Sequence, residues 1–139
     1  MIDTGFLPSK HGLSFGNDKG WGMCGGFVFL ARSLFVSKHE APKERNDFYL
    51  FWEQVLSLSI SELNKIRFWM TKTDEELKQH VASEVMLLKQ KLAGGPLPLM
   101  LIYGKGLEEI FENHQVLAWQ VDDHDDVLVY DPNQPGNDG

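Results

Sequence analysis

Residues 114–131 have the sequence HQVLAWQVDDHDDVLVYD, and this stretch decides the fold class. Two short runs rich in valine, leucine and aromatic residues, 114–121 and 127–131, flank a cluster of aspartates, which is typical of two β-strands joined by a turn. A four-residue loop over 122–125 is a common hairpin length. The sequence therefore predicts an antiparallel strand pair near the end of the chain.

Upstream of this hairpin, apolar residues recur every three or four positions, which indicates helices. Residues 24–37 are strongly apolar and predict a central, buried helix. A second helix is expected to start near Asn46, after Pro42 has broken the pattern. The residues expected to face inward from that second helix are Phe48, Phe51, Trp52, Val55 and Leu58.

Two capping boxes predict further helix starts. Ser59 with Glu62 opens a third helix, and Thr73 with Glu76 opens the longest one. That helix is stopped at 94–96 by two glycines and a proline.

A strand is expected over 97–103, whereas residues 1–21 lack sustained periodicity and are expected to form a loop or arm. Helices followed by an antiparallel sheet predict an α+β fold.

The composition is that of one domain, expected to span residues 1–139. Thirteen basic and twenty acidic side chains give a net charge of −7. Because such a field repels phosphate backbones and anionic lipids, neither nucleic-acid nor membrane binding is expected. No apolar run reaches the roughly 18 residues of a membrane helix, and no signal peptide is recognisable, so a cytoplasmic location is expected.

No metal or cofactor is expected. The histidines lack the spacing of a zinc site, and the aspartate cluster at 122–126 lacks the alternating ligands of a calcium loop. A solvated hairpin tip is the interpretation favoured for that cluster.

Cys24 is the only cysteine, and it stands where a glycine-rich loop over 20–26 turns into the first residues of the buried helix. Unpaired amides and the positive end of the helix dipole favour a thiolate there, so the thiol pKa is expected to fall. The alternative is a small residue at a packed helix end, because free cysteine is among the most buried residue types.

Two further residues are expected near the thiol. With a loop over 122–125, Val116 faces Asp131, and His114 becomes a diagonal neighbour of Asp131 at roughly 7 Å between backbones. A carboxylate there holds the imidazole by one nitrogen and leaves the other for the thiol. Cys24, His114 and Asp131 are thus the residue types of a nucleophile, a base and an orienting acid.

The sequences Gly22-Met-Cys-Gly-Gly26, Asn113-His-Gln-Val-Leu-Ala118 and Val129-Tyr-Asp-Pro-Asn-Gln-Pro-Gly136 resemble papain-like cysteine peptidases, in particular a compact bacterial and fungal branch of that fold. The likeness covers about residues 11–35 and 97–136. The intervening residues match only as an unspecific helical insert.

This resemblance implies that Cys24 is the nucleophile, His114 the general base and acid, and Asp131 the residue that orients the imidazole. It also implies a papain-like fold, in which the catalytic helix and the helical middle pack on a C-terminal antiparallel sheet, and a protein substrate. Compact modules of this kind also occur as toxin domains delivered between bacteria. In that case the location is the cytoplasm of the target cell, and an immunity or inhibitor protein that covers the cleft is an expected partner.

One departure from the family concerns the oxyanion. Papain-like enzymes usually carry a glutamine about six residues before the nucleophile, and Asp18 stands there. Because a carboxylate repels an oxyanion, Asn17 is expected to donate instead, together with the backbone amide of Cys24.

The sequence thus predicts a thiol hydrolase that cleaves peptide bonds. Two alternatives stay open: a glutamine deamidase or transglutaminase-like acyl transferase that uses the same triad, and a non-catalytic binding module with the papain-like fold.

Overall fold

The structure is a computed structural model that describes residues 1–17, 22–57, 60–102 and 112–139, with residues 60–63 described by their backbone alone. Within these ranges the chain forms five helices and four strands, an α+β fold as the sequence predicted. The elements in chain order are β1 (Ile2–Asp3), α1 (Pro8–His11), α2 (Cys24–Val36), α3 (Asp47–Ser57), α4 (Ile60–Met70), α5 (Asp74–Leu92), β2 (Leu97–Leu101), β3 (His114–Val121) and β4 (Val127–Tyr130).

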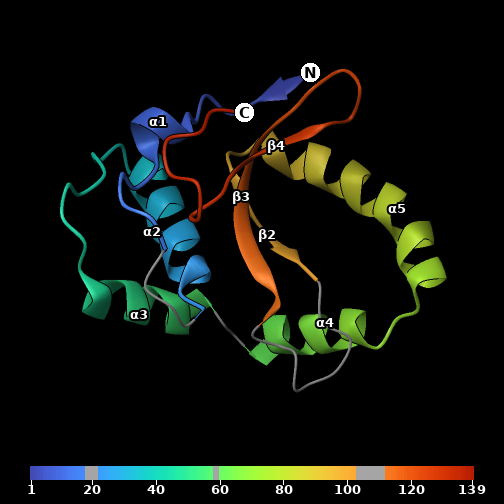
Figure 1. The fold of residues 1–139 in the computed structure, drawn as a ribbon. Coiled ribbons are helices and arrows are strands. Elements are labelled where there is room, and N and C mark those ends of the chain that lie inside the picture. The colour runs from blue at the N-terminus through green and yellow to red at the C-terminus, as the bar shows by residue number, and fades with distance from the viewer. Residues whose placement is uncertain (18–21, 58–59, 103–111) are drawn as a thin grey trace.

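The strands form one antiparallel sheet with β3 at its centre (Figure 1). β2 pairs with the first part of β3, β4 with its second part, and β1 with its last two residues. β1 and α1 lie within residues 1–21, where the sequence predicted only a loop or arm, so that prediction was wrong in part. Elements of two and four residues are too short to show a periodicity.

The β3–β4 hairpin has the predicted register at the end away from its loop, although the loop itself is one residue longer than predicted. The loop holds five residues, 122–126, so Val121 pairs with Val127. A β-bulge between Ala118 and Gln120 takes up the additional residue, because a bulge sets two residues of one strand against one of the other. Leu117 therefore still pairs with Tyr130, as the four-residue loop predicted.

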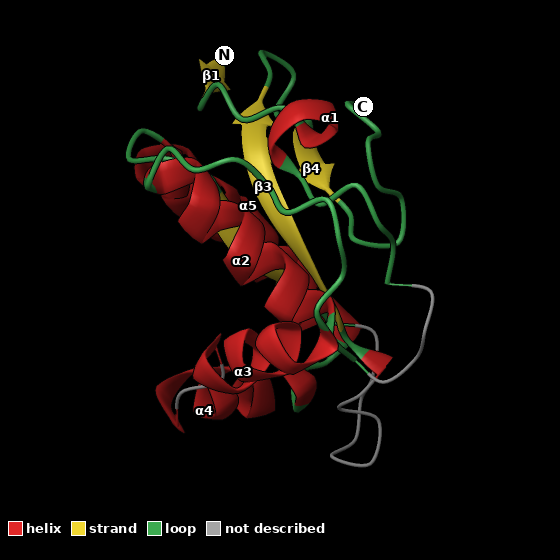
Figure 2. Cartoon of the chain, turned by 90° about the vertical axis from the view of Figure 1, so that its left-hand side faces the viewer, coloured by secondary structure: helices red, strands yellow, loops and turns green. Residues whose placement is uncertain are grey.

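Helices cover both faces of the sheet (Figures 1 and 2). The buried cluster between α2 and the strands consists of Phe6, Val28, Ala31, Leu117, Trp119 and Tyr130. The cluster between α5 and the strands consists of Leu88, Leu92, Ala118 and Val121. A third cluster joins α2 to α3 and to the segment that precedes α2. It consists of Leu13, Phe27, Leu30 and Leu50. α3 is thus held by α2.

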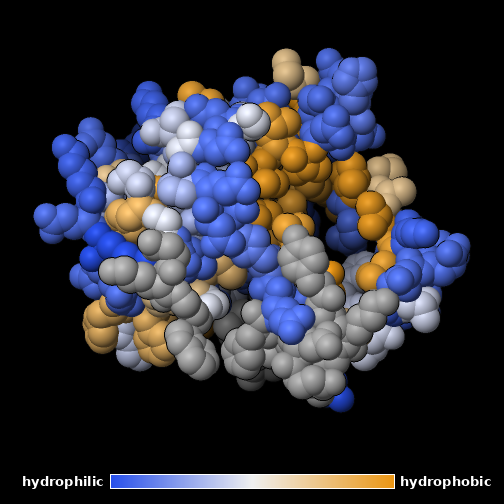
Figure 3. Space-filling view, viewed as in Figure 1, coloured by the Kyte–Doolittle hydropathy of each residue, from blue (hydrophilic) through white to orange (hydrophobic). Residues whose placement is uncertain are grey.

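The inward face predicted for α3 was wrong. Leu50 and Ser57 are the buried residues of α3, and Leu50 packs against Phe27 and Leu30 of α2. Leu58, the last of the predicted inward residues, lies outside the described residues. The aromatic residues face outward, with Phe48 72% and Trp52 48% exposed. Apolar atoms gather at the lower left of Figure 3, where α3 lies in Figure 1. Because apolar side chains surround this helix, periodicity could not identify its packed side.

The predicted start of α5 is confirmed. The Thr73 hydroxyl accepts from the Glu76 amide, and the Glu76 carboxylate accepts from the Thr73 amide, which completes a capping box. The predicted capping residue Ser59 and the end of the strand expected over 97–103 lie outside the described residues. No helix in the described ranges has both the length and the apolar character needed to cross a membrane.

Candidate active site

Cys24 is the first residue of α2, and its surroundings explain the two glycines that follow it. A Cβ on Gly26 would lie 2.2 Å from the Leu50 carbonyl oxygen of α3, and a Cβ on Gly25 would lie 1.9 Å from the Gln115 side-chain oxygen of β3. Gly26 is thus required where the backbone of α3 approaches α2, whereas a side chain at Gly25 would displace the ends of two glutamine side chains. The first residues of the loop predicted over 20–26 lie outside the described residues.

The thiol meets the start of β3. The Sγ atom of Cys24 accepts a hydrogen bond from the backbone N–H of Gln115 at 3.3 Å. On the β4 side, pairing stops at Leu117, so the edge of β3 is free of that strand at Gln115. The N-terminus of α2 therefore reaches the sheet just beyond the end of β4.

His114 and Asp131 are joined as the sequence predicted. The imidazole Nε2 of His114 lies 2.7 Å from Oδ1 of Asp131, and both side chains are partly buried. The same carboxylate oxygen accepts from the backbone N–H of Asn133 at 2.8 Å. The Asn133 amide thus fixes the Asp131 carboxylate, and the carboxylate holds the imidazole by Nε2. Nδ1, the other ring nitrogen, is not used in this contact.

The structure brings His114 close to the thiol. Its Cα lies two covalent bonds from the Gln115 nitrogen, about 2.4 Å by standard peptide geometry. That nitrogen is 3.3 Å from Sγ, so the His114 Cα lies within about 6 Å of the sulfur, a distance that an imidazole spans. Among the described residues, no hydrogen bond joins the His114 ring to the sulfur, and the ring is bonded to Asp131.

The thiol pKa moves opposite to the sequence-based expectation, which was therefore wrong. Burial raises the pKa of Cys24, whose residue is 6% exposed. The N–H groups of Gln115, Gly25 and Cys24 itself lower that pKa, and the charge of Asp131 adds to the rise. Because desolvation disfavours the thiolate more than these amides stabilise it, the resting sulfur is a neutral thiol at pH 7.

Asn17 lies beside the turn that follows Asp131. Its backbone N–H donates to the carbonyl oxygen of Pro132, the residue after Asp131. Its side-chain Oδ1 is buried without a hydrogen-bond partner among the described residues. This oxygen can only accept, so its state does not bear on the donor role expected of the Asn17 side-chain nitrogen. Asp18, at the position of the family's glutamine, lies outside the described residues.

Sequence reasoning missed two glutamines that contact the first turn of α2. Gln115 supplies the amide that reaches the thiol, and its side chain is 7% exposed. Gln54 of α3 accepts from the Gly26 N–H at 2.8 Å. No sequence signal marked Gln54, because a polar residue on a helix ordinarily faces solvent.

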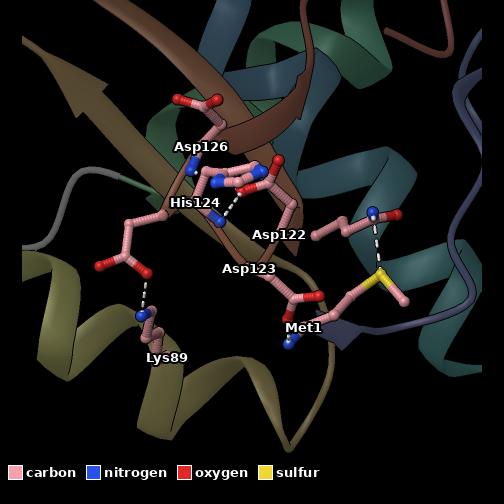
Figure 4. A network of polar contacts seen from close by, with 8 residues as sticks. Met1, Lys89, Asp122, Asp123, His124 and Asp126 are labelled. Atoms are coloured by element: carbon pink, nitrogen blue, oxygen red, sulfur yellow. Dashed lines mark hydrogen bonds and ion pairs between the residues drawn. The ribbon is translucent and has the colours of Figure 1, made fainter.

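The aspartates of the hairpin tip make hydrogen bonds within the tip and ion pairs with neighbouring segments (Figure 4). Oδ1 of Asp122 accepts from the backbone N–H groups of His124 at 2.8 Å and Asp126 at 2.9 Å. Asp125 pairs with Lys89 of α5, and Asp123 pairs with the amino group of Met1. Within the described residues, no group of three or more histidine, cysteine, aspartate or glutamate side chains is placed to hold a metal ion.

Comparison with protein families, with curated proteins and with solved structures found no match to this chain. The chemistry of the site therefore rests on its own residues. A thiol, an imidazole held by a carboxylate, and a helix N-terminus together suit nucleophilic attack on an acyl group.

Proposed function

We propose that this protein is a papain-like thiol hydrolase that cleaves peptide bonds in a protein substrate. One observation carries the proposal: the residue whose amide bonds the Cys24 sulfur directly follows His114, which is itself bonded to Asp131 at 2.7 Å. Cys24 begins α2, His114 begins β3, and Asp131 directly follows β4. Their convergence is what a Cys-His-Asp triad requires.

In the first half of the reaction, Nδ1 of His114 takes the proton of the Cys24 thiol while the sulfur attacks the substrate carbonyl carbon. The backbone N–H of Cys24 and the side-chain amide of Asn17 donate to the oxyanion that forms. The C–N bond then breaks, and the imidazolium gives its proton to the leaving amine. A thioester on Cys24 remains.

In the second half, His114 takes a proton from water, and the resulting hydroxide attacks the thioester carbon. The C–S bond breaks, the sulfur recovers its proton from the imidazolium, and the acid product leaves. Asp131 holds the ring through Nε2 in both halves, which leaves Nδ1 to exchange the proton.

The raised thiol pKa selects one version of this mechanism. A thiol whose pKa is raised by burial does not rest as a thiolate at neutral pH, so the proton must pass to His114 during attack. The activity of the enzyme is therefore expected to depend on His114 as a base in the step that forms the S–C bond.

The test compares proteomes of cells that express the wild type, Cys24→Ala, His114→Ala and Asp131→Ala. His124→Ala is the matched control, because His124 is exposed at the hairpin tip. New backbone termini with the wild type and the control, absent from the three site variants, support the peptidase. A mass increase of about 1 Da at glutamine supports the deamidase, and a new cross-link supports the acyl transferase. Identical proteomes for wild type and Cys24→Ala contradict all three.

We also propose, from the likeness to compact toxin modules, that the substrate lies in the cytoplasm of a target bacterium and that an immunity protein covers the site. Expression in bacteria then stops growth, and Cys24→Ala restores it. Unchanged growth with the wild type counts against this setting and leaves the peptidase assignment to the proteome experiment.

The exposed aromatic face of α3 favours a second candidate, a non-catalytic binding module. Phe48 is 72% exposed, and its ring contacts the exposed Trp52, which in turn contacts the exposed Phe51. Contiguous apolar patches of this kind mark interaction sites. A biological effect that survives Cys24→Ala and disappears with Phe48→Asp supports the binding module. The reverse pattern supports the enzyme.

A further inference from the structure

Gln115 combines near-complete burial with an unpaired oxygen. Its residue is 7% exposed, and its side-chain Oε1 has no hydrogen-bond partner among the described residues. Buried polar atoms are almost always paired, so this one calls for an explanation from its neighbours. Since the backbone N–H of the same residue bonds the Cys24 sulfur at 3.3 Å, the explanation bears on the thiol.

A second amide, that of Gln54, lies close to that oxygen. A Cβ built on Gly25 would lie 1.9 Å from Oε1 of Gln115 and 2.5 Å from Oε1 of Gln54, so both side chains crowd the same side of Gly25. Oε1 of Gln54 already accepts from the N–H of Gly26 at 2.8 Å. A carbonyl oxygen has two lone pairs, so Gln54 keeps the capacity for one more donor.

We infer that the Gln115 amide turns its nitrogen toward Gln54, so that Oε1 of Gln54 accepts from both Gln115 Nε2 and the Gly26 N–H. The carboxamide has nearly the same shape either way round, and only this direction pairs a donor with an acceptor. The three groups then form a clamp, by which we mean Gln54, Gly26 and Gln115. It joins α3, the first turn of α2 and the start of β3.

The clamp makes Gln54 and Gln115 positioning residues for the nucleophile, an assignment that rests on the proposed function of Cys24. The amides that lower the thiol pKa belong to Gln115, Gly25 and Cys24 itself. All three lie in the first turn of α2 or at the start of β3, the two elements that the clamp ties to α3. Loosening it moves these donors away from the sulfur, and the thiolate loses the stabilisation that opposes burial.

The test follows thiol chemistry, which is measurable whether or not a substrate is cleaved. Cys24 is the only cysteine, so alkylation by iodoacetamide, followed by intact mass across pH, reports on it alone. We expect Gln54→Leu and Gln115→Leu each to raise the apparent thiol pKa by about 0.5–1 unit, the size of one lost hydrogen bond. Gln90→Leu, the same substitution at an exposed position of α5, is the control and leaves it unchanged.

A double-mutant cycle separates a clamp from two independent glutamines. If the two amides bond to each other, Gln54→Leu/Gln115→Leu shifts the pKa by clearly less than the sum of the single shifts. Additive shifts, or a wild-type pH profile for Gln54→Leu, overturn the inference. A failed peptidase assay with these shifts present would sink the proposed function and leave the clamp standing.

A second measurement uses the wild type and so does not depend on the variants folding. In the clamp, one Nε2 proton of Gln115 is bonded inside the protein, so its exchange with water is slower than that of the exposed Gln90 side-chain amide. Side-chain amide exchange by nitrogen-15 NMR measures both. Equal exchange rates for the two residues overturn the inference.

Discussion

Gly26→Ala is the substitution whose effect the packing of α2 against α3 defines most sharply. A Cβ at this position would lie 2.2 Å from the Leu50 carbonyl oxygen and 3.1 Å from its carbon. The first distance is about 1 Å below the roughly 3.3 Å at which carbon and carbonyl oxygen touch. Since the clashing atoms are backbone, no side-chain rotation removes the overlap, and α3 has to move away.

The expected magnitude is a difference between two effects. Replacing a helical glycine by alanine alone stabilises a helix by about 1 kcal/mol. Overpacking of a filled interior costs about 1–3 kcal/mol, and a backbone clash belongs at the upper end of that range. We therefore expect Gly26→Ala to lower the free energy of unfolding by about 1–2 kcal/mol, or the melting temperature by roughly 3–7 °C for a chain of 139 residues.

Urea and thermal unfolding measure both quantities, with Gly94→Ala as the control. A Cβ on Gly94 meets its nearest neighbour, the Lys91 carbonyl oxygen, at 3.4 Å, so that variant should stay within about 0.5 kcal/mol of the wild type. A Gly26→Ala protein that melts at or above the wild-type temperature would refute the close approach of α3 to α2. That result would also contradict the contact between Gln54 and the first turn of α2, which depends on the same approach.

Three further outcomes follow from the hydrogen bonds and pKa shifts. Tyr130→Phe removes the hydroxyl that accepts from the buried Leu13 N–H at 3.3 Å, so urea unfolding should show a loss of about 1 kcal/mol, and an unchanged midpoint would argue against that bond. The N–H groups of Asp126 and His124 lower the pKa of Asp122. The contribution of this carboxylate to stability is therefore present at neutral pH and is lost as the pH falls below about 4. Between pH 7 and 3, the melting temperature of Asp122→Ala should fall less than that of the wild type. Burial raises the pKa of Cys24, so iodoacetamide should label the native protein more slowly at pH 7.5 than the urea-unfolded protein, and equal rates would contradict the burial of the thiol.

The sequence by itself determined the elements that carry the candidate site. The apolar pattern after Cys24 predicted a buried helix, and α2 begins at that residue. The run rich in valine, leucine and tryptophan at 114–121 predicted the strand that became β3, with His114 as its first residue. Both signals are local, because each is carried by the residues of the one element that it predicts. The contact between His114 and Asp131 followed from strand pairing over a short loop, which is also nearly local.

Only the tertiary structure decided which face of α3 is packed and how the thiol titrates. Phe48 and Trp52 looked like core residues, yet Leu50 lies inside because Gly26 of α2 lets the α3 backbone approach at that point. The helix N-terminus predicted a lowered pKa for Cys24, but burial raises it. Desolvation and helix contacts depend on what surrounds a residue in space, and neighbours that are distant along the chain set both.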